Sequence, residues 1–205
     1  MRTIRWIVIS SSETANRSGQ PVDVSVEQLR QHHQTHNGWS DTDAHFLVRF
    51  SGAIETGRDL ATVGVHVGGF EKEAIVICVA GHGDLQPFRL TQRSALGQLC
   101  ARLCRQYSLS PLRVIGRRES DAHGAPAFPM TSPGKLVDMA VIRADVARAH
   151  LSPAPTPGEL KHATLLRPPP VQDHTDEPAA SRTVSDRLDQ LEQRMLAIET
   201  LLDVA

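Results

Sequence analysis

The sequence is poor in cysteine, carries almost no net charge and has no long apolar run. Three cysteines in 205 residues form no pattern typical of a disulfide framework. A formal net charge of −1 gives no electrostatic reason to expect general binding to nucleic acid or to an anionic membrane. No stretch approaches the roughly 20 apolar residues that span a bilayer. The short apolar run after Met1 is predicted to be a first strand and not a signal peptide, which needs a longer apolar region.

The first ~150 residues alternate strand-like and helix-like patterns, which predicts an α/β domain with a central sheet. Strands are expected at residues 4–9, 46–50, 53–56, 74–80 and 114–115, and helices at 26–36, 91–107 and 135–150. Ser25 and Gln28 form a capping box for the first helix. Cys100 and Cys104 share one face of the second helix, where we expect buried apolar residues. Half a metal site is the alternative for this pair.

The composition changes at Leu151, where prolines become frequent. Because proline lacks a backbone donor and restricts its predecessor, residues 151–181 are predicted to be an extended linker. The domains expected are therefore 1–150, the linker 151–181 and a C-terminal helix at 182–205.

Apolar residues of this last segment are spaced alternately four and three apart, which is the seam of a heptad repeat. The seam predicts a coiled coil through which copies of the chain self-associate. The alternative is one amphipathic helix docked on its own domain. The seam residues are Val184, Leu188, Leu191, Met195, Ile198 and Leu202.

An ordered set of short motifs in residues 1–130 carries a family resemblance. The set comprises Trp39-Ser40-Asp41 with His45-Phe46, Ser51-Gly52 with Glu55-x-Gly57-Arg58, residues 63–66 (VGVH), residues 75–78 (IVIC) and the helix with Thr91, Gln92, Ala95 and Leu96. Together they resemble zinc N-acetylmuramoyl-L-alanine amidases of the phage-lysozyme and peptidoglycan-recognition type. The resemblance implies a central mixed β-sheet flanked by helices.

The resemblance also implies a zinc ion held by three side chains and a catalytic tyrosine. The positions that match the ligands hold Ser10, Arg117 and Ala125, and the tyrosine position holds Ala44. Serine is a poor zinc ligand, alanine is none, and arginine brings a permanent positive charge to the place of a cation. We therefore expect no metal, no cofactor and no catalytic residue at these degenerate positions.

Other polar residues match positions around the groove of the family. His45, Arg49, Arg58, His66 and His123 are candidates for binding a ligand there. The alternative is that these five residues lie on the surface or line the cleft without binding a ligand. A new metal site built from the ten histidines, such as the i, i+4 pair His32 and His36, is a further hypothesis.

Without the metal ligands, the first hypothesis is a catalytically inactive structural or interaction protein, not an enzyme. The resemblance implies a bacteriophage or prophage origin, and on the first hypothesis we expect synthesis in the bacterial cytoplasm and a final place in the virion among other virion proteins. The second hypothesis is a peptidoglycan-binding module that does not cleave. The third is an active amidase with relocated metal ligands. No nucleic acid and no membrane insertion are expected.

Overall fold

The protein is described by a computed structural model that covers residues 2–64, 71–123 and 130–152. It has a five-stranded sheet in the order β3-β2-β4-β1-β5. The strands are β1 (Trp6–Ser11), β2 (Phe46–Val48), β3 (Ile54–Thr56), β4 (Ala74–Val79) and β5 (Val114–Gly116). Neighbours β2, β4, β1 and β5 run parallel, and only the edge strand β3 is antiparallel to its neighbour β2. The sheet is therefore mixed, as the resemblance implied.

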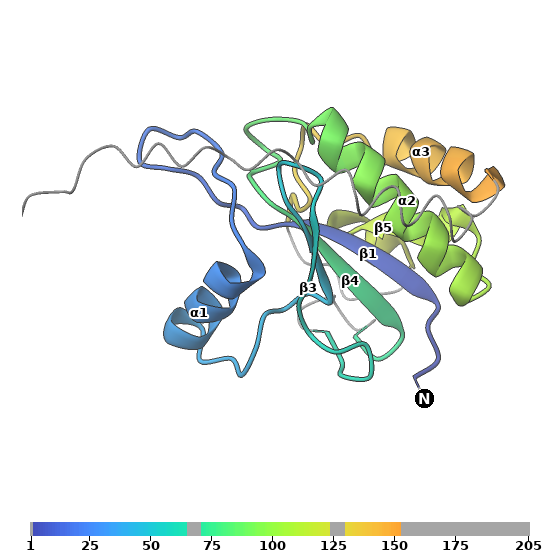
Figure 1. Ribbon diagram of the computed structural model, residues 1–205, viewed down its shortest axis with the longest axis horizontal. Helices are drawn as coiled ribbons and strands as arrows, with labels where there is room; N and C mark the ends of the chain where they lie inside the picture. Colours follow the sequence, from blue (N-terminus) through green and yellow to red (C-terminus); the bar gives the residue numbers. More distant parts are fainter. Residues whose placement is uncertain (1, 65–70, 124–129, 153–205) are drawn as a thin grey trace, which may run out of the picture. The chain divides into compact units, whose positions relative to one another are not determined.

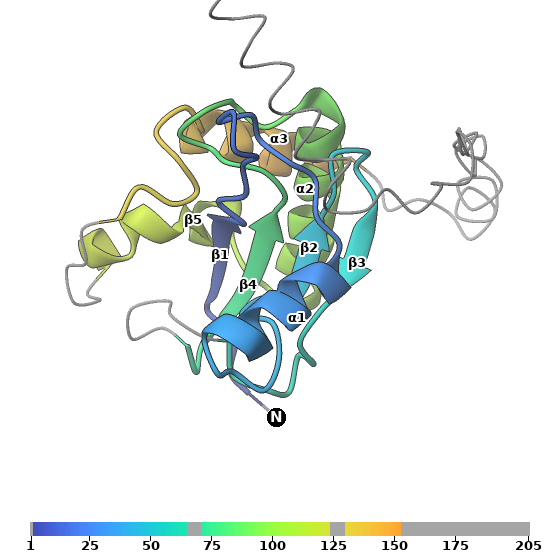
Figure 2. The ribbon, with the colours of Figure 1, turned by 90° about the vertical axis from the view of Figure 1, so that its left-hand side faces the viewer.

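The three α-helices in the described part of the chain cover the two faces of this sheet unequally. The helices are α1 (Val26–His36), α2 (Leu90–Gln106) and α3 (Met139–Leu151), and three short 3₁₀ helices are η1 (Pro111–Arg113), η2 (Arg117–Glu119) and η3 (Asp121–His123). Figure 1 and Figure 2 show α2 and α3 on one face and α1 on the other. Among the described residues, one α-helix thus covers the face toward α1 and two cover the opposite face.

Strands β1 and β4 lie at the centre because both of their faces are apolar. All six residues of β4 are buried, as expected for a strand covered on both sides. Alternate residues of β1 point to opposite faces. Ile7 and Ile9 pack with α2 and α3, whereas Trp6 and Val8 belong to a second cluster with Leu29 of α1.

Local sequence explains where most elements begin and end. Helix α1 has the predicted bounds, because Ser25 accepts a hydrogen bond from the Gln28 amide and the Gln28 side chain accepts one from the Ser25 amide. The turn between β2 and β3 places Gly52 at φ +87°, where a Cβ would lie 2.9 Å from the carbonyl oxygen of Thr91. The predicted hairpin around Gly52 is confirmed.

Three expectations differ from the structure or fall outside it. Helix α3 begins at Met139 and not at Lys135, because the Asp138 side chain accepts from the amides of Ala140 and Val141 and so caps the helix there. Strand β1 lies about two residues later than expected. The linker and the C-terminal helix lie in residues 153–205, outside the described residues, and stay predictions.

Cys100 and Cys104 are buried and free, which confirms the apolar interpretation of this pair. Burial raises the pKa of Cys100 far above its usual range and that of Cys104 to about 11, so both thiols are protonated at neutral pH. Within the described residues, no helix is both long and apolar enough to cross a membrane.

Candidate functional site

Three side chains form a row across the carboxyl ends of the neighbouring strands β4, β1 and β5. Ser10 of β1 pairs in register with Cys78 of β4. Ile9 pairs with Gly116 of β5, so the next residue, Arg117, follows beside Ser10. Open sheets of parallel strands bind their ligands at the carboxyl ends of the strands. We call Cys78, Ser10 and Arg117 the strand-end row.

The strand-end row contains polar atoms that the protein does not satisfy. Ser10 is fully buried, and its hydroxyl lies beside the thiol of Cys78, which is at most a weak hydrogen-bond partner. The Ser10 hydroxyl has no other partner among the described residues. The Nε atom of Arg117 is buried without a hydrogen-bond partner, and within the described part of the chain this guanidinium forms no ion pair. Buried polar groups are nearly always paired, so the weakly paired Ser10 hydroxyl and the unpaired Arg117 Nε leave hydrogen-bonding capacity at this edge of the sheet.

Charges of both signs act on the strand-end row. Burial raises the pKa of the Cys78 thiol well above its usual range, and the negative charges of Asp43 and Glu13 raise it further. The hydrogen bond from Ser10 and the positive charge of Arg117 act in the opposite direction but do not cancel the rise of the Cys78 pKa. Cys78 is therefore a neutral thiol and not a thiolate, which is the form that attacks a substrate or binds a metal.

The strand-end row does not fit the zinc ion that the resemblance implies. Zinc needs three nitrogen, sulfur or carboxylate ligands and a free position for water. Ser10 offers a neutral hydroxyl, and Arg117 brings a fixed positive charge with a buried, unpartnered Nε–H group that can only donate. In residues 2–64, 71–123 and 130–152, no group of three His, Cys, Asp or Glu side chains lies close enough together to hold a metal ion. No catalytic step can therefore be assigned to zinc at these positions.

Ala44 and His45 lie just before β2, and Ala44 belongs to the apolar cluster on the α1 side of the sheet that also contains Cys78. Ala44 is 2% exposed and presents only a methyl group where the family has a tyrosine. The His45 ring is fully buried, and its Nδ1 accepts a hydrogen bond from the Val76 amide at 2.9 Å. Its Nε2 lies 3.0 Å from the carbonyl oxygen of Thr62, so Nε2 carries the proton. Burial lowers the pKa of His45, and the positive charges of Arg2 and Arg58 lower it further.

The two arginines predicted to line the groove are held by the protein itself. Arg49 forms ion pairs of 2.8 Å with Asp23 and with Glu55. Arg58 is 8% exposed and donates to the carbonyl oxygens of Thr42 at 2.8 Å and Val63 at 3.1 Å. Both side chains fix loops around β2 and β3, and a role of these residues in ligand binding stays a prediction.

The predicted histidines do not gather at one place. His123 is exposed, and its ring centroid lies 4.7 Å from that of Trp6, the first residue of β1 and hence at the opposite end of this strand from Ser10. His66 lies outside the described residues. His32 and His36 stack on the exposed surface of α1, with ring centroids 4.4 Å apart. The helical spacing thus brings two imidazoles together, but no third ligand joins them among the described residues.

Cys78 and Asp43 lie near Ser10 and Arg117, and neither residue was predicted to belong to the site. Parallel pairing of the two apolar strands β1 and β4 could have predicted that Cys78 lies next to Ser10. A shift of one residue in this pairing would turn the side chains of one strand to the wrong face of the sheet, so the apolar pattern restricts the register. No sequence signal predicts Asp43. Arg2 was also missed: its guanidinium donates to the backbone carbonyls of Leu60, Thr62, Glu71 and Ala74 and so ties the loops near His45 to the N-terminus.

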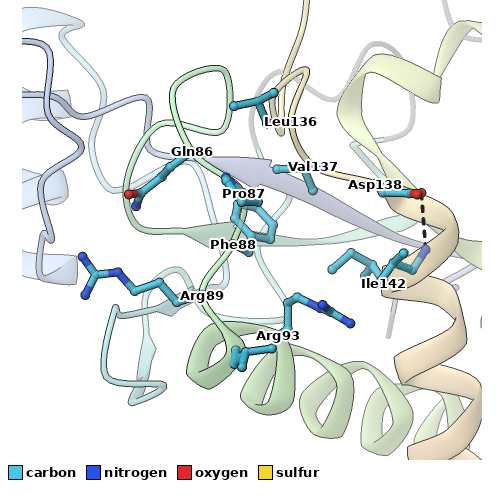
Figure 3. A pocket seen from close by; sticks show the side chains of 11 residues that line it. Gln86, Pro87, Phe88, Arg89, Arg93, Leu136, Val137, Asp138 and Ile142 are labelled. Atoms are coloured by element: carbon cyan, nitrogen blue, oxygen red, sulfur yellow. Dashed lines mark hydrogen bonds between the residues drawn. The ribbon is translucent and has the colours of Figure 1, made fainter.

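A separate cavity of about 520 Å³ lies between the loop after β4 and the first turns of α2 and α3 (Figure 3). Apolar side chains from Phe88, Leu90, Val137 and Ile142 line it, with Arg93 at its side. Arg93 is already paired with Asp145 at 2.7 Å. This cavity is lined by different residues from the strand-end row, and no group in it points to a particular ligand.

Phage endolysins share part of this sequence. The endolysin of Klebsiella phage KP32 is 36% identical over 92 residues, which are 42% of this chain and 60% of that protein. The endolysin of Enterobacteria phage K11 is 37% identical over 82 residues, 40% of this chain and 50% of that protein. The endolysin of Escherichia phage T7 is 31% identical over 111 residues, 52% of this chain and 72% of that protein. The chain thus spans only 50% to 60% of the length of the first two relatives.

Solved structures of two kinds have the same fold. The N-acetylmuramoyl-L-alanine amidase LysC from Clostridium intestinale URNW superimposes with a TM-score of 0.59 at 20% identity, over 71% of this chain and 87% of that one. Drosophila peptidoglycan recognition protein SD superimposes with a TM-score of 0.56 at 17% identity, over 70% of this chain and 81% of that one. At these identities the likeness establishes the fold.

The expectation of a catalytically inactive virion component is wrong. It rested on the side chains at four positions, whereas the similarity of the surrounding sequence is to phage proteins named as endolysins. The expected location in the virion is wrong for the same reason, and so is the conclusion that the chain is not an enzyme. The side chains at four positions determine which chemistry that site can support, but they do not determine the class to which the protein belongs.

The domain that carries the strand-end row also matches a family model. The match covers residues 1–135, about two thirds of the chain, and the description of the model is N-acetylmuramoyl-L-alanine amidase. It includes all five strands and both helices α1 and α2. The chain belongs to the N-acetylmuramoyl-L-alanine amidase family.

Proposed function

We propose that this chain acts on bacterial peptidoglycan as an N-acetylmuramoyl-L-alanine amidase of the phage endolysin kind. The observation that carries the proposal is the family match over residues 1–135, together with identities of 31% to 37% to phage endolysins. The bond cleaved would be the amide between the muramoyl group and L-alanine. The strand-end row is the part of the site that would face this bond, since it occupies the carboxyl ends of the central strands.

The side chains of this site differ from those of a zinc enzyme, so the proposal includes no metal-dependent step. His45, Arg49, Arg58, His66 and His123 remain the proposed contacts to the glycan and peptide. Two of them also stabilise the loops on either side of β2 and β3, Arg49 through its ion pairs and Arg58 through its hydrogen bonds to backbone carbonyls. This arrangement supports a ligand-binding groove that is preformed and not assembled on binding.

A second candidate function is recognition of peptidoglycan, and the strand-end row favours it. Ser10 and Arg117 contribute hydrogen-bond donors with no strong protein partner, a property of a binding site more than of a metal centre. Both candidates place the same ligand at the same edge of the sheet. They differ only in whether the amide bond is broken.

One experiment on purified peptidoglycan tests both candidates. The full-length chain is incubated with sacculi, and released amino groups are identified as N-terminal L-alanine by mass spectrometry. In parallel, the bound fraction is measured by co-sedimentation. New L-alanine amino termini are the expected result for the amidase. Co-sedimentation without new termini would leave recognition, and the absence of both would overturn the proposal that peptidoglycan is the target.

We further infer that residues 182–205 act as an oligomerisation segment. Six apolar residues at alternate spacings of four and three support this, because the spacing keeps one seam facing a partner helix. Such assembly would present several wall-binding domains at once and so raise the effective concentration of each at the polymer surface.

A further inference from the structure

The residue that stands where the family holds a metal ligand is itself a cation. Arg117 follows β5 directly and lies beside Ser10, whose position matches another metal ligand of the family. An arginine guanidinium is always protonated and presents a planar fork of N–H donors that matches a carboxylate. A positive charge therefore persists at this edge of the sheet, although its carrier is a side chain and not an ion.

The unsatisfied atoms of the strand-end row define which ligand would complement it. Nε of Arg117 can only donate, and it is buried without a partner. The hydroxyl of Ser10 is fully buried beside a thiol that is a poor acceptor. Leaving such groups unpaired costs free energy, which a ligand with two acceptor oxygens would recover. The Ser10 hydroxyl, whose described partner is only this weak acceptor, can turn to a stronger one.

Two acidic side chains near the row limit the choice of ligand. Asp43 and Glu13 act on Cys78 with negative charge, so a highly charged anion is disfavoured. Asp43 is turned partly toward α1, where its carboxylate lies 3.9 Å from the His33 ring. Glu13 is exposed and screened by water. A singly charged carboxylate fits the row better than a phosphate, because it matches the guanidinium fork with less repulsion from these two residues.

We propose that Arg117 and Ser10 form a carboxylate-binding site in place of the metal centre, and that it takes a carboxylate of the peptide stem of peptidoglycan. The carboxylate would accept from Nε and one terminal nitrogen of Arg117, with the Ser10 hydroxyl donating to the same group. The second half of this proposal rests on the proposed function, since it takes peptidoglycan as the ligand. The first half concerns the site alone.

The site is tested first with acetate, which does not depend on peptidoglycan. The Nε–H resonance of Arg117 is followed by NMR of the full-length chain as sodium acetate replaces sodium chloride at constant ionic strength. The resonance is assigned by its loss in Arg117→Lys. A saturable shift is expected for Arg117 and not for Arg113, an exposed arginine that lies 4.4 Å over the Trp6 ring and serves as the matched control. An Arg117 resonance that does not move, or moves linearly like that of Arg113, would overturn the proposal.

Substitutions separate a binding role from a structural one. Ser10→Ala removes a hydroxyl that has no strong partner, so the thermal midpoint should stay the same or rise while acetate affinity falls several-fold. Arg117→Gln should lower acetate affinity about tenfold or more, as expected for the loss of a charge-assisted hydrogen bond. Unchanged acetate affinity in both variants would contradict the assignment.

A soluble muramoyl-peptide then tests the link to peptidoglycan. We expect the peptide with free carboxylates to bind the full-length chain about tenfold more tightly than its methyl ester. Arg117→Gln should abolish this difference. Equal binding of acid and ester in the wild-type chain would refute the stem-peptide assignment while the acetate result stands. Failure to co-sediment with sacculi would instead count against the proposed function.

Discussion

The Nδ1 atom of His45 accepts a hydrogen bond from the backbone amide of Val76 at 2.9 Å, which fixes the loop before β2 to the central strand β4. The acceptor exists only while Nδ1 is unprotonated. On the other side of the ring, Nε2 donates to the carbonyl oxygen of Thr62. The neutral ring thus joins three separate segments of the domain, and a charged ring would break one of the two connections.

This relationship predicts an acid-sensitive contribution to stability. Burial lowers the pKa of His45 in the folded protein, so below the unfolded value of about 6.5 the unfolded chain binds more protons. The free energy of unfolding should therefore fall as the pH drops below about 6.5 and continue to fall down to the folded-state pKa. Urea unfolding followed between pH 5 and pH 7.5 measures the slope.

The variant His45→Gln isolates this contribution. Glutamine keeps one acceptor and one donor but does not titrate, so its stability should depend less on pH than that of the wild type. The matched control is His32→Gln, which replaces an exposed histidine on α1 and should retain the wild-type slope. Equal slopes for all three proteins would show that the protonation of His45 does not control the acid response.

A second prediction concerns the arginine that bridges two acidic residues. Arg49→Met should lower the free energy of unfolding by about 1–3 kcal/mol, because it leaves the half-buried carboxylates of Asp23 and Glu55 without their partner. Arg5→Met should change it by less than about 0.5 kcal/mol, since the Arg5–Glu73 pair is largely exposed and 3.6 Å long. Chemical denaturation of both variants at neutral pH provides the comparison. Similar losses would mean that burial does not separate the two ion pairs.

Local signals made the elements of the fold predictable. The capping box at Ser25 and the continuous apolar run of β4 each depend on neighbours in the sequence, and both were placed correctly. The start of α3 was placed too early because the apolar spacing does not show which of several residues caps the helix. In the structure the cap is Asp138, three residues after the predicted start. Spacing in the sequence therefore predicted which elements exist better than where they begin.

The site was predictable only in part, because its contacts join distant segments. Family motifs identified Ser10 and Arg117, but they did not indicate that both carry unsatisfied buried atoms. His45 was expected to line the groove, and its ring contacts Thr62, Val76 and Arg2, which lie 17 to 43 residues away in the chain. No periodic pattern encodes such contacts.

A third prediction concerns the segment beyond the described residues. The full-length chain should be oligomeric, whereas a chain ending at Ser152 should be monomeric, as measured by multi-angle light scattering. Leu191→Asp should behave like the truncated chain, because it places a charge in a desolvated seam. The matched substitution Gln193→Asp, which falls outside the seam, should leave the oligomer intact. Equal subunit numbers for the full-length and truncated chains would contradict the predicted coiled coil.

The last prediction concerns zinc and the three positions that match its ligands. The wild-type chain should retain no stoichiometric zinc after dialysis, because Arg117 repels a cation and Ser10 is a poor ligand. The triple variant Ser10→His, Arg117→His and Ala125→Cys should bind about one zinc ion per chain, since it supplies three ligands of the kind zinc prefers. The double variant Ser10→His and Ala125→Cys keeps Arg117 and should bind zinc far more weakly, which separates the missing ligands from the added charge. Elemental analysis of the three dialysed proteins measures the zinc content directly. A wild-type chain with one tightly held zinc ion would show that the metal is bound by residues other than these, and equal zinc in the double and triple variants would show that the charge of Arg117 does not oppose it.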